Sequence, residues 1–178
     1  MTTLPEHPTT ISFMVPLAIS NAIAVKVGFA NGAENIPDLK KYSFVGVVMS
    51  VLFMMCSALV FSSFPKPIVG IFTVDDNLFK IAVPVMYILS VFQVFDGLQI
   101  ALAGICKGVK QTNIVLFANF VAYWCVSIPL GYILAFKFNL HLTGFWIGLV
   151  VSALILCSIM MYKLKKYYVV QYQKQELE

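Results

Sequence analysis

The sequence predicts an all-α integral membrane protein with five transmembrane helices. Of its 178 residues, 60% are hydrophobic and only 11% are charged, and the mean hydropathy is +0.89. A soluble domain is closer to half apolar and a quarter charged. The apolar excess is gathered in five runs, each about as long as the roughly 20 residues that a helix needs to cross a bilayer.

The first two runs cover residues 10–30 and 42–64. The first contains Pro16, which removes one helical donor and frees a carbonyl a turn earlier. Between the runs, Asn31-Gly32 and Pro37-Asp38 are typical of a turn. The apolar stretch 68–74 that follows the second run is too short to span a membrane and is predicted to form an interfacial helix.

The remaining runs cover residues 78–105, 112–136 and 142–162, joined by connections at 104–111 and 137–141. Pro129 with Gly131 is expected to kink or loosen the fourth helix. The whole chain then divides into a polar leader at 1–10, a transmembrane bundle at 11–166 and a tail at 167–178.

Lysine placement orients the bundle. Eight lysines fall on one side of the predicted membrane and three on the other, with Lys26 left out because it lies inside the first run. The positive-inside rule makes the eight-lysine side cytoplasmic. It is formed by Lys40, Lys41, Lys107, Lys110, Lys163, Lys165, Lys166 and Lys174. Because the bases lie in connections and not on a soluble domain, no nucleic-acid partner is predicted.

Five crossings that end in the cytoplasm place the N-terminus outside. An N-terminus that must itself be moved across the membrane is less common than a loop in that place, as a piece of a longer chain would have. We therefore expect this sequence to be a piece of a larger polytopic protein.

Asp96 lies inside the third run, where an acid costs on the order of 2.5 to 3.5 kcal/mol at a helix centre. Gln93 and Gln99 are three residues to either side, so all three share one sector of the helix, next to Phe92. One acid and two amides could bind a cation or exchange it for a proton. The alternative is a neutral acid that is hydrogen-bonded to a neighbouring helix.

Two further groups of polar residues could line a cavity. Asn119, Tyr123 and Ser127 follow one another at intervals of four in the fourth run, a stripe that also suits interhelical hydrogen bonding. Asn21 lies at mid-depth in the first run, where a purely structural role is the simpler interpretation.

No enzymatic constellation is visible in the sequence. There is no Ser/His/acid set at membrane depth, no HExxH motif and no P-loop spacing. The four cysteines lack CxxC spacing and are interpreted as small buried hydrophobes. We predict a non-enzyme without a cofactor.

Three stretches resemble the multidrug and toxic compound extrusion (MATE) family, in its NorM-type members. The segment 13–35 is similar to the eighth helix and its loop, and 91–108, with Asp96, is similar to the tenth. Tyr123-Trp124, Pro129-Leu130-Gly131-Tyr132 and the segment 144–148 match the eleventh and twelfth. The matches occur in order over about residues 13–166.

The resemblance implies helices eight to twelve of a twelve-helix transporter, that is, most of its C-terminal lobe. It implies export of drugs and organic cations in exchange for Na⁺ or H⁺, with Asp96 at the coupling position. Phe92 stands where a tyrosine often precedes that acid, which removes one oxygen ligand. The missing N-terminal lobe would come from the same polypeptide or from a partner chain.

The expected location is a bacterial inner membrane. Two alternatives remain open. The first is a lipid or polysaccharide flippase of the same superfamily, although such cavities usually hold several bases, and only Lys26 approaches membrane depth here. The second is a non-transporting membrane fragment or gene remnant in which Asp96 is only structural.

Overall fold

The computed structural model describes residues 7–72 and 75–176, and the regular structure within them is helical. Most of the predicted leader, 1–10, lies outside these residues, as do the last two residues of the predicted interfacial helix and of the tail. The elements are α1 (His7–Gly32), α2 (Ile36–Ser63), α3 (Pro65–Phe72), α4 (Asp76–Gly108), α5 (Thr112–Phe120), the π-helix η1 (Val121–Ser127), α6 (Ile128–Tyr132), the π-helix η2 (Ile133–Lys137) and α7 (His141–Glu176).

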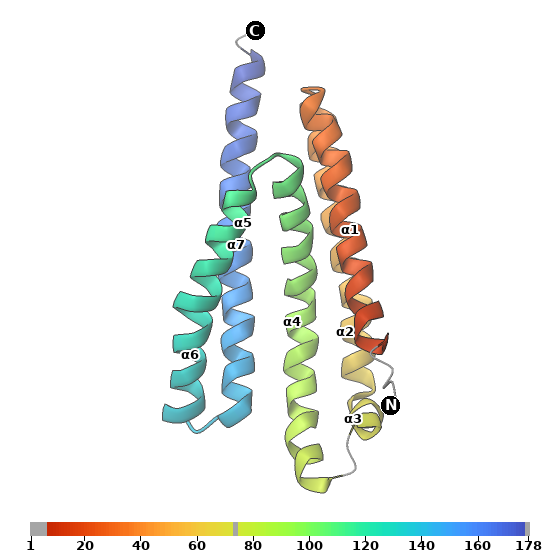
Figure 1. The fold of residues 1–178 in the computed structure, drawn as a ribbon, viewed down its shortest axis with the longest axis vertical. Coiled ribbons are helices and arrows are strands. Elements are labelled where there is room, and N and C mark those ends of the chain that lie inside the picture. Colours follow the sequence, from red (N-terminus) through yellow and green to blue (C-terminus); the bar gives the residue numbers. More distant parts are fainter. Residues whose placement is uncertain (1–6, 73–74, 177–178) are drawn as a thin grey trace, which may run out of the picture.

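The long helices pack side by side as an up-and-down bundle (Figure 1). α4 is central, since it packs against α1, α2 and α7, while the rod from α5 to η2 packs along α7. The α1–α2 and α4–α5 connections lie at the same end of the bundle as the C-terminal part of α7, which is the eight-lysine side (Figure 1). The short helix α3 and the η2–α7 connection lie at the opposite end.

Four helical segments in the described chain are long and apolar enough to cross a membrane: Ile36–Ser63, Leu78–Gly108, Thr112–Lys137 and His141–Gln173. α1 is 26 residues long and coincides with the first predicted run. The predicted all-α membrane fold is confirmed, and the count of four applies to the described residues only.

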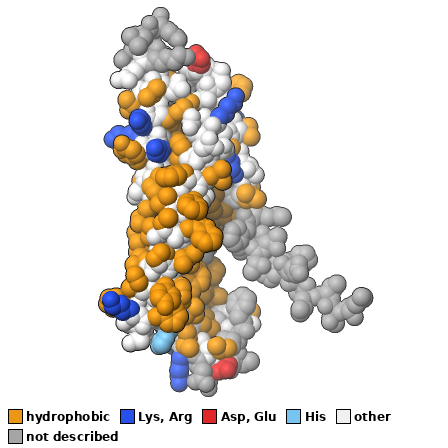
Figure 2. Space-filling model, turned by 60° about the vertical axis from the view of Figure 1, so that its left-hand side comes forward, with side chains coloured by type: hydrophobic (Ala, Val, Ile, Leu, Met, Phe, Trp, Pro, Cys, Tyr) orange, Lys and Arg blue, Asp and Glu red, His pale blue; other side chains and the backbone are white. Residues whose placement is uncertain are grey.

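The outer surface of the bundle is apolar, as contact with lipid requires. Phe29 is 78% exposed, and Phe44 and Trp124 are also largely exposed. On the face drawn in Figure 2, hydrophobic side chains form a band between lysines near the two ends. This distribution is the reverse of a soluble protein, in which large exposed apolar patches are rare.

Two connections differ from the sequence expectation. Pro37 and Asp38 belong to the first turn of α2, because Asn35 caps that helix. The Asn35 Oδ1 accepts a hydrogen bond from the Asp38 backbone N–H at 3.1 Å. Backbone N–H groups in a first turn have no partner within the helix, so proline, which lacks one, is tolerated there. α4 runs on through Gly108, and α7 continues through the predicted tail to Glu176. The predicted connection residues 104–108 are therefore helical.

Glycine allows the close contacts between helices. An added Cβ at Gly104 would lie 2.6 Å from the backbone oxygen of Ser20 on α1, and one at Gly108 would lie 2.9 Å from that of Ala24. Gly104 and Gly108 have the small-xxx-small spacing that brings membrane helices together. Gly144 and Gly148 of α7 repeat this spacing against η2 and α6.

The fourth predicted span is one rod with π-helical turns on both sides of Pro129. Proline has no N–H for the carbonyl four residues earlier and clashes with it. The wider π-helical turn of η1 accommodates that defect without ending the helix.

Candidate ion-coupling site

Asp96 is half-buried in the middle of α4. Gln93 and Gln99 are also half-buried, one on either side of it along the helix. Among the residues that the structure describes, the Asp96 carboxylate has no hydrogen bond or ion pair. The interhelical hydrogen bond required by a purely structural acid is therefore not present within this part of the chain.

Both glutamines present an unsatisfied oxygen. Gln93 Oε1 and Gln99 Oε1 are buried without a hydrogen-bond partner in the described part of the chain. Leaving such a group unpaired costs about 1 to 3 kcal/mol, so each one calls for an explanation. Carbonyl and carboxylate oxygens are the ligands that hard cations prefer. We refer to Gln93, Asp96 and Gln99 as the polar cluster.

Neighbouring helices supply the walls around this part of α4. Gln99 Nε2 donates to the hydroxyl of Tyr123, on η1, at 3.3 Å. The ring of Phe92 meets Trp146 of α7 edge-on, with 6.4 Å between centroids. Cys157 of α7 lies 3.7 Å from the Phe95 carbonyl. The polar cluster thus lies in a stretch of α4 that is flanked by η1 and α7.

The other residues predicted to line a cavity have fewer contacts with the polar cluster. Asn119 is half-buried on α5, one turn before Tyr123. Asn21 is exposed on α1, which approaches α4 through Ser20 and Gly104 instead. The structure therefore brings Tyr123 to the polar cluster and leaves Asn21 on the surface.

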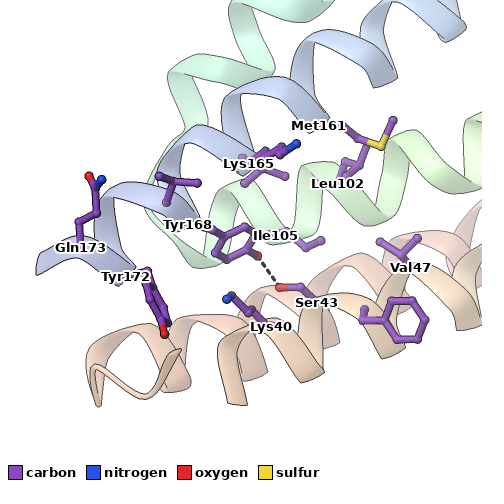
Figure 3. Close-up of a pocket in the computed structure, with 13 residues that line it drawn as sticks. Lys40, Ser43, Val47, Leu102, Ile105, Met161, Lys165, Tyr168, Tyr172 and Gln173 are labelled. Atoms are coloured by element: carbon purple, nitrogen blue, oxygen red, sulfur yellow. Dashed lines mark hydrogen bonds between the residues drawn. The ribbon is translucent and has the colours of Figure 1, made fainter. Parts of the chain in front are cut away.

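A pocket with a largely apolar lining was not anticipated from the sequence. A pocket of about 880 Å³ opens at the eight-lysine side between α2, α4 and α7. Lys40 and Lys165 line it, and Ser43 Oγ lies 2.7 Å from the hydroxyl of Tyr168 (Figure 3). In the sequence these lysines indicated only orientation, since nothing local shows that the start of α2 meets the far part of α7.

The fold and the polar cluster define a multi-pass membrane protein with an acid held inside a spanning helix. A sequence profile of the MatE family matches residues 8–133, and the chain belongs to that family. The predicted resemblance to NorM-type members is confirmed by its curated relatives.

The "Probable multidrug resistance protein NorM" of Mesorhizobium japonicum is 36% identical over 157 residues, which cover 83% of this chain and 34% of the relative. The protein of the same name from Bacillus subtilis is 31% identical over 153 residues, covering 83% and 34%. The chain thus spans about a third of the length of these relatives.

Two solved structures share the fold. The eukaryotic MATE transporter AtDTX14 superposes with a TM-score of 0.77 at 21% identity, covering 90% of this chain and 37% of the other. An inward-facing multidrug resistance MATE family transporter of the MOP superfamily gives a TM-score of 0.84 at 15% identity, covering 93% and 38%.

Proposed function

We propose that the chain forms most of one lobe of a secondary active transporter that exports drugs and organic cations in exchange for Na⁺ or H⁺. The family membership and the names of its relatives support drug export. The observation that carries ion coupling is the polar cluster, an unpaired carboxylate inside a spanning helix beside two unsatisfied amide oxygens.

In this proposal Asp96 alternates between holding the coupling ion, Na⁺ or H⁺, and releasing it. A cation held by the carboxylate and the oxygens of Gln93 and Gln99 offsets the charge that the membrane disfavours. A proton on the carboxylate removes the same charge, so the two ligands compete for Asp96. Capture of the coupling ion on the outer side and its release to the cytoplasm, linked to movement of the drug in the opposite direction, gives exchange.

Tyr123 supplies a hydroxyl near the position where Phe92 replaces the tyrosine that the family often has. Its hydroxyl is hydrogen-bonded to Gln99, so a phenolic oxygen reaches the polar cluster from η1 instead of from α4. In the proposed site Tyr123 orients the Gln99 amide and leaves the oxygen of that amide free for the cation.

The flippase alternative is less well supported. The lysines that line a described pocket, Lys40 and Lys165, lie at the eight-lysine side and not at the depth of Asp96. A cavity that carries anionic phosphates through the membrane needs cations along its path. The polar cluster offers an acid and amides, which suit a cation better.

Alternating access requires two lobes that move about a central cavity. We infer that this segment works with a second lobe, from the same polypeptide or a partner chain, in a bacterial inner membrane with the eight-lysine side in the cytoplasm. Reading the DNA upstream of Met1 tests that inference. About seven further apolar spans in frame would support it, and a stop or frameshift would favour a gene remnant.

The test of Asp96 is dye efflux by the complete transporter in a drug-sensitive host. Asp96→Asn keeps the size of the side chain and removes its charge, so efflux should fall to the level of the empty host while membrane expression persists. Glu34→Gln is the matched control, because Glu34 is an exposed acid in the α1–α2 connection. Efflux that survives Asp96→Asn would refute the coupling role.

A further inference from the structure

Neighbouring helices bind the backbone carbonyls on both sides of Asp96. Ser50 Oγ of α2 donates to the Gly97 carbonyl at 2.8 Å. Cys157 Sγ of α7 lies 3.7 Å from the Phe95 carbonyl, although a thiol is a weaker donor than a hydroxyl. Because both acceptors are main-chain atoms, these contacts hold the helix itself, and the Ser50 contact is the stronger of the two.

The Ser50 hydroxyl makes a different hydrogen bond from other serines of the bundle. Ser43, Ser90 and Ser158 each donate to the carbonyl four residues earlier in their own helix. Such a bond satisfies a serine inside a helix without any neighbour. Ser50 is 1% exposed, and its hydroxyl donates across to α4 instead. This buried bond therefore joins two helices next to Asp96.

Gly97 makes the contact with α2 possible, because it has no side chain on that face of α4. An added Cβ would lie 2.6 Å from Met54 Cγ and 3.1 Å from the Ser50 backbone oxygen. Ser50 and Met54 are four residues apart, so they share one face of α2. This face packs directly on the backbone of Gly97, one residue after Asp96.

The direction of the Asp96 side chain depends on how Gly97 is held. Successive residues of a helix point about 100° apart, so with Gly97 turned to α2 the carboxylate of Asp96 points to another side of α4. A rotation of α4 by about 10° would move a group about 5 Å from the helix axis by about 1 Å. A binding site has to be held to about 0.5 Å. The contact that fixes this rotation therefore also fixes the geometry of the polar cluster.

We propose that Ser50 is a positioning residue for ion coupling. Its hydroxyl holds α4 at Gly97 and so keeps the carboxylate of Asp96 where it can share an ion with the free oxygens of Gln93 and Gln99. Ser50 does not touch the ion, because it acts through the backbone of α4. This inference rests on the proposed coupling role of Asp96.

Gradient-driven dye movement by the complete transporter in proteoliposomes tests the proposal. The rate is measured over a range of concentrations of the ion whose gradient drives movement. In Ser50→Ala the half-saturating ion concentration should rise roughly three- to twentyfold, which corresponds to the loss of one hydrogen bond between membrane helices. The maximal rate should stay within about twofold, because Asp96 itself is intact.

Ser90→Ala is the matched control. Ser90 is also a buried serine and lies on α4 itself, but it donates within its own helix, to the Met86 carbonyl. Its replacement should leave the half-saturating ion concentration unchanged. An equal rise in Ser90→Ala and Ser50→Ala would mean a general loss of stability. That result, or no rise in Ser50→Ala, would overturn the proposal.

Gly97→Ala disturbs the same contact from the other helix, because the added Cβ separates α4 from α2. The half-saturating ion concentration should rise in this variant as well, so it provides the test even if Ser50→Ala does not fold. In Ser50→Ala/Gly97→Ala the rise should be no greater than in the more affected single variant, since both changes break one contact. No rise in Gly97→Ala, or rises that multiply in the double variant, would refute a shared positioning contact.

Asp96→Asn in the same assay separates this inference from the coupling role. If Asp96→Asn abolishes gradient-driven movement while Ser50→Ala behaves like the unaltered protein, only the positioning role of Ser50 is wrong. If Asp96→Asn still responds to the gradient, the coupling role of Asp96 is wrong and the positioning role is wrong with it.

Discussion

The contact between α1 and α4 gives the sharpest structural prediction. A Cβ at Gly104 would lie 2.6 Å from the Ser20 backbone oxygen and 3.1 Å from its Oγ. A Cβ at Gly28, in the same interface, would lie 3.5 Å from the nearest atom, the oxygen of Gly108, which is ordinary contact. Gly104→Ala must therefore push α1 away, whereas Gly28→Ala fits.

The expected change in the free energy of unfolding follows from comparing the two variants. Alanine in place of glycine inside a helix gains up to about 1 kcal/mol from helix propensity, and this gain is common to both sites. Only Gly104→Ala also overpacks the interface, which costs about 1 to 3 kcal/mol. Gly104→Ala should thus be less stable than Gly28→Ala by about 1 to 3 kcal/mol.

The assay is equilibrium unfolding in mixed detergent micelles, followed by circular dichroism. Gly70→Ala in α3 is a further control, because nothing lies within 4 Å of the added Cβ. If Gly104→Ala and Gly28→Ala have the same free energy of unfolding within about 0.5 kcal/mol, the close approach of α1 and α4 through Gly104 is wrong.

Two other predictions concern orientation and the link between α2 and α7. In a variant without the four natural cysteines, Lys66→Cys should react with an impermeant maleimide on intact cells, and Lys41→Cys should react only after lysis. The reason is that the eight-lysine side is inferred to be cytoplasmic. The reverse labelling pattern would mean that the inferred topology is inverted. A double-mutant cycle of Ser43→Ala and Tyr168→Phe should give a coupling free energy of about 0.5 to 1.5 kcal/mol for the 2.7 Å contact, measured by the same unfolding assay. A coupling of zero would mean that this hydrogen bond does not join the helices.

The helices could be found in the sequence because apolar length is a local property. Their ends were harder to place. Pro37 has the composition of a turn, but the Asn35 cap turns it into the start of α2. Gly104 and Gly108 also resemble turn residues, yet tertiary contact with Ser20 and Ala24 of α1 explains their presence inside a helix.

The polar cluster could be predicted because Gln93, Asp96 and Gln99 lie within two turns of one helix. Its contact with Tyr123 could not, since the register between α4 and η1 depends on packing. The pocket between α2, α4 and α7 was missed for the same reason. Lys40 and Lys165 are 125 positions apart, and only the packing of α2 against α4 and α7 places both on the lining of one pocket.

The central claim is that Asp96 couples a cation gradient to export, and gradient-driven transport by the complete protein in proteoliposomes tests it most directly. A sodium or proton gradient is imposed separately on vesicles with the unaltered protein or with Asp96→Asn. One of the two gradients should accelerate dye movement in the unaltered protein and neither should in Asp96→Asn, while dye exchange without a gradient persists in both. Acceleration of equal size in Asp96→Asn would contradict the account.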